Sequence, residues 1–251
     1  MRSIPSTPVF GKEVRMKLVN RFQRQLVTAA LAAVILIVSA SAASAFGPRV
    51  PQVALNGASL QGVLNGFGES INVYTDQVDA QRWTSSVSGN ATFTLMIELA
   101  GYAASNEIGV YNAADPPNPP LFTIFPGAAT AGWFATCHFG PGGSLTVLLY
   151  DQNAVSQGST GYAGVNRMDF GFYLKGPGGT FYSQDSRNSG NAQILTYLGT
   201  GQNYGDWWEC FEDLPWNSGD NDFDDAVLLL QSVAPTPVSA HTWGALKALY
   251  R

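Results

Sequence analysis

An acidic stretch near the C-terminus holds the side chains whose types and spacing are best suited to chemistry. Its eight carboxylates are Asp206, Glu209, Glu212, Asp213, Asp220, Asp222, Asp224 and Asp225. The sequence has no Lys or Arg between Arg187 and Lys247, so no counter-charge lies nearby along the chain. Because Ca²⁺ takes roughly six to eight oxygen ligands, a bound Ca²⁺ ion is the favoured way to hold these carboxylates together.

The order of the acids suggests which of them bind the ion. Side chains alternate along an extended segment, so Asp220, Asp222 and Asp224 are expected on one side and Asp225 on the other. A turn at residues 218–219 would bring the preceding acids back toward them. The predicted metal ligands are Asp220, Asp222 and Asp225 as the strongest, then Asp213 and Glu212, with Asp224 completing the set.

The stretch does not match an EF-hand loop. Asp225 stands where that motif has Gly, and Gln231 stands where it has its bidentate Glu. The alternative to a Ca²⁺ site is a solvated acidic rim, in which the carboxylates accept hydrogen bonds from backbone amides in Asx turns.

Short β-branched and aromatic runs, separated by Gly, Asn, Ser and Pro, predict the elements that position these acids. The expected strands are residues 71–74, 92–99, 107–111, 121–125, 132–139, 145–150, 168–174, 180–183, 194–198, 207–211 and 226–230. This pattern is typical of an all-β fold, and we expect an antiparallel β-sandwich resembling a jelly roll. In residues 168–174, Phe170, Phe172 and Leu174 alternate with Asp169, Gly171 and Tyr173, which predicts a half-buried strand.

Two further local patterns concern connections and helices. Gly-Pro-Gly-Gly occurs at residues 140–143 and 176–179, each time between two expected strands, and predicts a hairpin connection. Residues 60–65 could form one short helix, although the glycine at position 62 weakens the pattern.

The N-terminus has the features of an export signal. Six basic residues precede an apolar run at residues 26–38, and Ala43-Ser44-Ala45 forms an A-x-A cleavage site. We expect a signal peptide at residues 1–45, with translation starting at Met1 or Met16; the alternative is a retained membrane anchor. One β-sandwich domain is expected at residues 46–234, followed by a Pro-containing linker and a short amphipathic tail at residues 235–251.

Cleavage at this site would make the chain strongly acidic. Residues 1–45 contain six of the 13 Lys and Arg residues and one of the 18 Asp and Glu residues. The remainder has seven basic and 17 acidic residues, a net charge of −10. Such a surface argues against nucleic acid and anionic lipid as partners. No second apolar segment suggests a membrane span after cleavage.

The remaining residues with potential chemistry give few catalytic patterns. In an exported protein a Cys137–Cys210 disulfide is the favoured interpretation, and two buried free thiols are the alternative. No nucleophile motif or zinc motif occurs. Paired carboxylates could hydrolyse glycosides, and the candidates are Glu98, Glu107, Glu209 and Glu212.

Tryptophans suggest a second class of function, polysaccharide binding. Trp207, Trp208 and Trp216, together with Trp133, could offer flat surfaces on which sugars stack. The alternative is that these indoles fill the core. Exposure of coplanar Trp side chains on one face would favour the binding module.

Four motifs together resemble a known type of domain. They are Phe170-Gly-Phe-Tyr-Leu174, Phe181-Tyr-Ser-Gln-Asp185, Phe211-Glu-Asp-Leu214 and Gly219-Asp-Asn-Asp-Phe-Asp-Asp-Ala-Val227. Over roughly the last 100 residues before Pro235, the chain resembles an uncharacterised Asp-rich C-terminal β-domain of secreted bacterial surface proteins, many of them sorted by the exosortase (PEP-CTERM) route. The resemblance implies export, a β-sandwich and a Ca²⁺ site, and it implies no established reaction. The sorting tail usual in such proteins is absent, and Asp224 stands where they usually have Asn.

The sequence therefore predicts a secreted, calcium-binding protein of the bacterial cell surface or extracellular matrix. Its expected role is structural or adhesive and not enzymatic, with extracellular polysaccharide or other surface proteins as partners. A carbohydrate-binding module is the first alternative, and a secreted glycoside hydrolase is the second.

Overall fold

The computed structural model describes residues 47–236, and most of their regular structure is β-strand. The strands are β1 (Trp83–Ser85), β2 (Asn90–Glu98), β3 (Glu107–Asn112), β4 (Leu121–Phe125), β5 (Phe134–Phe139), β6 (Leu145–Tyr150), β7 (Ser156–Tyr162), β8 (Phe170–Gly176), β9 (Gly179–Tyr182), β10 (Ile194–Leu198), β11 (Trp207–Phe211), β12 (Ala226–Gln231) and β13 (Val233–Pro235). The helical segments are α2 (Ser59–Gly66) and the 3₁₀ turns η1 (Ala103–Ser105), η2 (Asp185–Asn188) and η3 (Gly201–Asn203).

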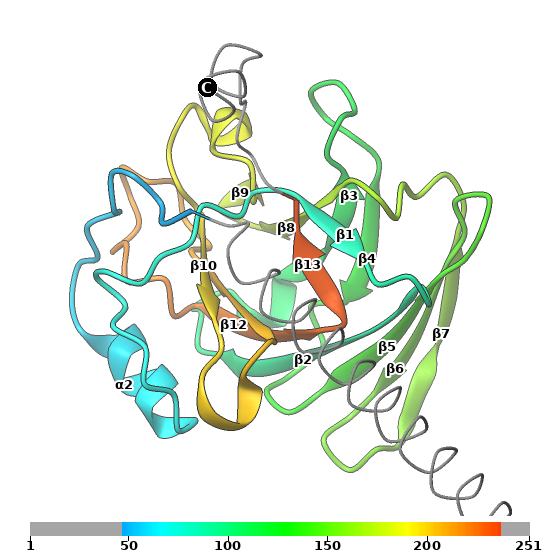
Figure 1. Ribbon diagram of the computed structural model, residues 1–251, viewed down its shortest axis with the longest axis horizontal. Coiled ribbons are helices and arrows are strands. Elements are labelled where there is room, and N and C mark those ends of the chain that lie inside the picture. The colour runs from blue at the N-terminus through cyan, green and yellow to red at the C-terminus, as the bar shows by residue number, and fades with distance from the viewer. Residues whose placement is uncertain (1–46, 237–251) are drawn as a thin grey trace, which may run out of the picture. The chain divides into compact units, whose positions relative to one another are not determined.

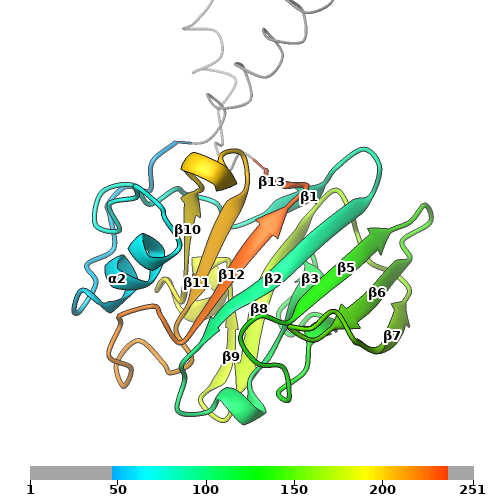
Figure 2. The same cartoon turned by 90° about the horizontal axis from the view of Figure 1, so that it is seen from below.

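The strands form two antiparallel sheets that pack face to face (Figures 1 and 2). One sheet has the strand order β10-β11-β12-β2-β5-β6-β7. The other has the order β13-β1-β8-β3-β4, with β9 paired to β8. The predicted all-β antiparallel sandwich is therefore confirmed.

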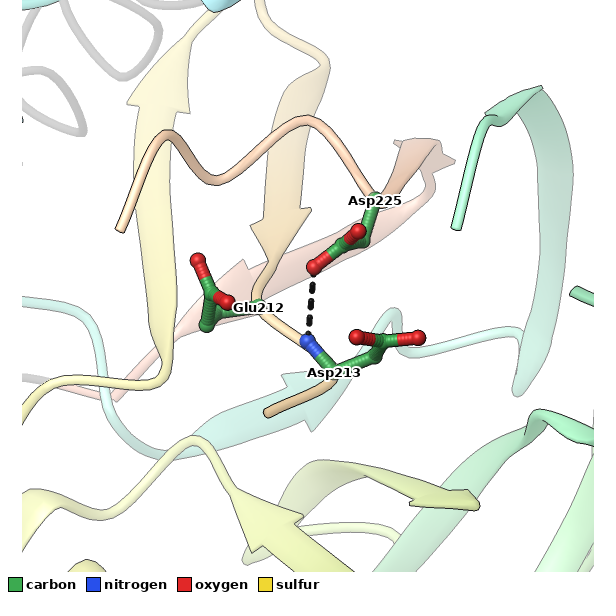
Figure 3. A group of neighbouring side chains, drawn as sticks. All are labelled: Glu212, Asp213 and Asp225. Carbon is green, nitrogen blue, oxygen red and sulfur yellow. Dashed lines mark hydrogen bonds between the residues drawn. The ribbon is translucent and has the colours of Figure 1, made fainter. Parts of the chain in front are cut away.

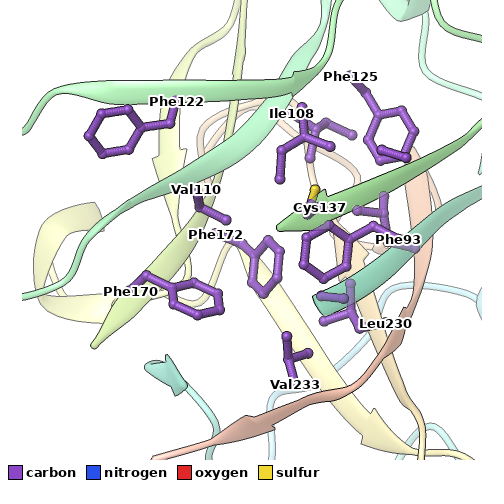
Figure 4. Packing of buried hydrophobic residues seen from close by; sticks show 14 of the residues in the cluster. Phe93, Ile108, Val110, Phe122, Phe125, Cys137, Phe170, Phe172, Leu230 and Val233 are labelled. Carbon is purple, nitrogen blue, oxygen red and sulfur yellow. The ribbon is translucent and has the colours of Figure 1, made fainter. Parts of the chain in front are cut away.

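The main core lies between the two sheets, because inward-facing residues of both are large and apolar. On β8, Phe170, Phe172 and Leu174 are completely buried there, as their alternation predicts. Phe172 packs edge-on against Phe93 (Figure 4) and against Trp83, with ring centroids 5.5 Å away in each case. Such edge-to-face aromatic pairs add stability beyond the burial of apolar area.

The opposite face of β8 is buried as well, so the expectation of a half-buried strand is wrong. Tyr173 lies in a small cluster with Tyr111 and Tyr182, and all three side chains are buried. The guanidinium of Arg187 lies 5.0 Å from the Tyr111 ring centroid. Gly171 fits between these groups because a Cβ atom there would lie 2.5 Å from the Tyr111 side chain.

A second apolar cluster covers the outer face of the seven-stranded sheet at β10, β11 and β12. Leu60 and Leu64 of α2 pack there with Trp208 and Val227, and all four are buried. The short helix suggested by the sequence is thus present, and Figure 2 shows it beside this end of the sheet. Packing of its two leucines stabilises a helix that is too short to form alone.

Two connections between strands form the hairpins that their Gly and Pro residues predict, and one segment expected to be a strand lies in a turn. The Gly-Pro-Gly-Gly segments at 140–143 and 176–179 join β5 to β6 and β8 to β9 as antiparallel hairpins. Residues 71–74, expected to be a strand, belong to a turn in which the Asn72 Oδ1 atom accepts the Tyr74 amide at 3.0 Å.

The domain ends slightly later than expected. β13 pairs with β1, and Pro235 lies opposite Trp83 in this ladder. The backbone N–H of Thr236 donates to Arg82 O at 2.7 Å. The expected signal peptide and nearly all of the expected tail lie outside the described residues. Within residues 47–236, no helix combines the length and the apolar character needed to cross a membrane.

Candidate metal centre

The part of the acidic stretch that follows β11 forms the loop that connects β11 to its neighbour β12. β11 ends at Phe211 and β12 starts at Ala226, and these two residues lie opposite each other in the ladder. The amides of Ser218 and Gly219 both donate to Pro215 O, at 2.8 and 2.9 Å. This turn folds the loop back, so that its beginning and its end lie side by side.

The second half of the loop is not extended, contrary to the alternation expected from the sequence. Asn221 and Phe223 both have left-handed backbone conformations, with φ of 57° and 61°. The Phe223 side chain is completely buried in the cluster beneath α2. Asp224 stays beside Asp222, because its backbone N–H donates to Asp222 Oδ1 at 3.3 Å.

The loop brings five carboxylates into two overlapping groups. Ligand oxygens of Glu212, Asp213 and Asp225 lie within 4.8 Å of one another. Those of Glu212, Asp220 and Asp222 also lie within 4.8 Å of one another. All five belong to the predicted ligand set, and the structure leaves the sixth predicted ligand, Asp224, outside both groups.

The first group sits where the loop leaves β11 and enters β12 (Figure 3). The backbone N–H of Asp213 donates to Asp225 Oδ2 at 2.8 Å, which ties the two ends of the loop together. The Asp213 carboxylate accepts a hydrogen bond of 3.0 Å from Asn106 Nδ2. These hydrogen bonds hold Asp213 and Asp225 in place, and each carboxylate keeps a second oxygen that could bind a cation.

Two residues beside this group come from distant parts of the chain. Glu98, at the end of β2, lies opposite Ala226 in the ladder. Asn106 immediately precedes β3. The sequence marks Glu98 only as a hydrolase candidate and does not mark Asn106. The position of Glu98 depends on the pairing of β2 with β12, and that of Asn106 on its hydrogen bond to Asp213, which lies 107 residues further along the chain.

Burial and mutual repulsion oppose ionisation of these acids. Burial is the main cause that raises the pKa of Glu212 to about 8, and the charge of Asp225 adds to it. Burial likewise raises the pKa of Asp225 to about 7, against the hydrogen bond from the Asp213 backbone. The pKa of Glu98 rises to about 8 through burial, with further contributions from Asp213 and Asp225.

Glu212 has the least satisfied carboxylate of the cluster. Its side chain is 0% exposed, and neither Oε1 nor Oε2 has a hydrogen-bond partner. A buried carboxylate without a partner is costly, by at least about 1–3 kcal/mol. The ion pairs found across residues 47–236 join Arg49 to Asp185, Arg82 to Asp169 and Lys175 to Glu107, so none neutralises this cluster. A hard divalent cation fits this set of bare oxygens.

The predicted disulfide is wrong, because Cys137 and Cys210 are both free and buried. The strands that carry them, β5 and β11, are separated in the sheet by β2 and β12. Three strand spacings amount to about 14 Å, whereas the Cα atoms of a disulfide lie within about 7 Å. The two thiols also point to opposite faces, since Cys137 lies between the sheets and Cys210 lies beneath α2 (Figure 4).

The tryptophans considered for sugar stacking separate into buried and partly exposed positions. Trp207 faces the core between the sheets and Trp208 faces the cluster beneath α2, with 6% and 0% exposure. This pair fills the interior and offers no surface to a ligand. Trp216 is half-buried and lines a concavity of about 270 Å³ on the loop.

The glutamates considered for glycoside hydrolysis are paired with other side chains or buried in the fold. Glu107 lies 3.8 Å from Lys175 Nζ. Glu209 is completely buried, and its Oε1 atom lies 2.7 Å from Thr196 Oγ1. Since Glu209 and Glu212 are both shielded from solvent, neither can meet a glycoside unless the fold opens.

Comparison of the chain with protein-family models, with curated proteins and with solved structures finds no match.

Proposed function

We propose that this chain is a secreted, calcium-binding protein of the bacterial cell surface or extracellular matrix, with a structural or adhesive role and no catalytic activity. The observation that carries the calcium proposal is the completely buried Glu212, whose two unpartnered oxygens lie among four aspartates. The export proposal rests on the charge and hydropathy pattern of residues 1–45 and on the A-x-A site that ends at Ala45.

Calcium would stabilise the fold through a simple linkage. A cation that binds the folded loop and not the unfolded chain stabilises the protein in proportion to the logarithm of its concentration. Sites of the extracellular type have a Kd of about 0.1–1 mM. At about 100 times the Kd the gain is about 2.7 kcal/mol, which for a domain of this size raises Tm by roughly 5–10 °C.

Scanning calorimetry of the purified protein tests this proposal directly. The protein is first treated with EDTA, and Tm is then measured in 10 mM CaCl₂, in 10 mM MgCl₂ and in EDTA. We expect the largest rise with Ca²⁺, and a Glu212→Gln variant should lose most of that rise. An unchanged Tm in Ca²⁺ would refute calcium stabilisation.

Export has its own test. Expression of the full chain in a bacterial host, followed by fractionation and N-terminal sequencing, should yield an exported product that begins at Phe46. A product confined to the cytoplasm with an intact N-terminus would refute this part of the proposal.

A second candidate function, polysaccharide binding, is favoured by the concavity beside Trp216. Phe181, Ser189, Asn191 and Asn217 also line it, so an aromatic surface adjoins hydroxyl and amide groups. Aromatic faces with a few polar groups are typical of small-ligand sites. Titration with soluble neutral oligosaccharides should quench Trp fluorescence, and Trp216→Ala should abolish the change. Trp133→Ala serves as a control at another half-buried indole; equal loss in both variants would count against this site.

A further inference from the structure

The two carboxylate groups of the acidic loop share one member, Glu212. For brevity, Glu212 with Asp213 and Asp225 is called the inner group, and Glu212 with Asp220 and Asp222 is called the outer group. Each group is compact, with ligand oxygens that lie within 4.8 Å of one another. Across the described part of the chain, the five residues do not merge into one group at this distance.

The spacing of these oxygens can be compared with the span of a single ion. Ca²⁺ binds oxygen at about 2.3–2.6 Å, so two ligands on opposite sides of one ion are at most about 5 Å apart. Each group alone fits around one ion. The five ligand oxygens are not all within 4.8 Å of one another, so two neighbouring ions suit this division better than one ion shared by all five acids.

The negative charge of the loop also favours two cations. The five carboxylates carry five negative charges when ionised, and Glu98 adjoins the inner group. One divalent cation would leave a net charge of −3 on the five acids, whereas two cations would leave −1. No described Lys or Arg forms an ion pair with them, so a second cation would remove most of the repulsion that remains among the ionised acids.

The environment of Glu212 is an independent observation that points to a bridging ligand. The residue is 0% exposed, and both of its oxygens lack hydrogen-bond partners. Its Oε1 atom points toward Gly219, where an added Cβ atom would lie only 2.2 Å away. Gly219 directly precedes Asp220, so this oxygen faces the segment that carries the outer group. A carboxylate has two oxygens and can bind one ion through each.

We infer that the loop binds two Ca²⁺ ions bridged by Glu212, an inner ion held with Asp213 and Asp225 and an outer ion held with Asp220 and Asp222. This inference rests on the proposed calcium function and adds its stoichiometry and the role of the bridge. The outer ion would be the more accessible of the two, because Asp220 is exposed whereas Asp213 is 3% exposed.

Isothermal titration of the EDTA-treated protein with CaCl₂ tests the inference, because it counts bound ions. Wild type should bind two. A variant with Asp220→Asn and Asp222→Asn should bind one, and a variant with Asp213→Asn and Asp225→Asn should also lose one ion. Glu212→Gln should weaken both sites at least tenfold. Asp206→Asn is the control, because it removes an acid at the other end of β11, where Asp206 Oδ2 accepts a hydrogen bond of 2.9 Å from Gln231 Nε2, and it should still bind two ions.

The outcomes separate the two levels of the proposal. Binding of one ion by wild type would overturn the bridged pair and leave the calcium function intact, whereas binding of none would overturn both. Loss of an ion in the Asp206→Asn protein would also overturn the inference. Near-UV circular dichroism confirms that each variant is folded. If the variant with Asp213→Asn and Asp225→Asn unfolds, the variant with Asp220→Asn and Asp222→Asn still decides the test. Asp220 is exposed and Asp222 is half-buried, so these changes should leave the fold intact.

Discussion

Glu209→Gln probes how the fold holds a carboxyl group in its interior. Glu209 is 0% exposed, and burial raises its pKa well above the ordinary value of 4.5, although Thr196 and Arg49 partly offset this effect. Thr196 Oγ1 lies 2.7 Å from Glu209 Oε1 and 3.2 Å from Ala80 O. The hydroxyl has a single proton, so both contacts are satisfied when a protonated Glu209 donates to Thr196 and Thr196 donates to Ala80. Glu209 is therefore expected to be neutral in the folded protein.

The size of the effect follows from proton linkage. Above pH 4.5 the unfolded chain releases the Glu209 proton while the folded chain keeps it, so the unfolded state binds fewer protons and stability falls as pH rises. The fall continues until the pH reaches the raised pKa of the folded state. Each pH unit over which only the unfolded chain releases this proton costs up to about 1.4 kcal/mol, so wild type should lose up to about 2.6 kcal/mol between pH 5 and 7 relative to the Gln variant, whose amide does not titrate.

Urea unfolding of both proteins at pH 5 and pH 7 measures this difference. E209Q should gain on wild type between the two pH values, by up to about 2.6 kcal/mol. Glu107→Gln is the control: the Glu107 side chain is 40% exposed beside Lys175, so its effect should change by less than about 0.5 kcal/mol. If E209Q differs from wild type by the same amount at both pH values, Glu209 is ionised in the fold and the reasoning fails.

Three further predictions concern the core. Unfolding without reductant should expose two thiols to maleimide while the native protein reacts with none, because Cys137 and Cys210 are free and buried; no labelling after unfolding would show a disulfide. Gly171→Ala should cost about 1–3 kcal/mol in urea unfolding, since its methyl group would meet the Tyr111 side chain at 2.5 Å, whereas Gly101→Ala has open space and should not show this loss. Phe172→Ala should cost about 3–5 kcal/mol, and Leu148→Ala, at a position 39% exposed, less than about 1 kcal/mol; equal losses would place the core elsewhere.

The sequence predicts the strands of this fold well where apolar residues drive pairing. Ten of the eleven expected runs overlap observed strands, and residues 121–125, 145–150, 194–198 and 207–211 match the observed bounds. Three observed strands, β1, β7 and β13, overlap none of the expected runs. The longest of them, β7, has the sequence Ser-Gln-Gly-Ser-Thr-Gly-Tyr, which lacks apolar alternation and is almost entirely exposed. It is a strand because its backbone pairs with β6 through a hairpin, and a side-chain pattern does not report that pairing.

The sequence predicts which residues form the candidate site, but it predicts their arrangement in space only in part. The acids and the turn that gathers them are visible in the sequence. The positions of Asp220, Asp222 and Asp224 depend on the left-handed conformation of Asn221 and Phe223, which the burial of Phe223 imposes. The failed disulfide and the overlooked Glu98 have a common origin, because both depend on the lateral order of strands far apart along the chain.

The lateral order of these strands also has a consequence for how the protein is made. β12 joins the β10–β11 hairpin to β2, and Leu230 lies opposite Phe93 in that ladder. Until the ribosome has released residues near 230, the early strands β2, β5, β6 and β7 have no bond to the later half of their sheet. Pairings this distant form slowly. A nascent chain would therefore lack these pairings until residues near 230 are available, and a polypeptide in that loose state can be threaded through a translocation pore.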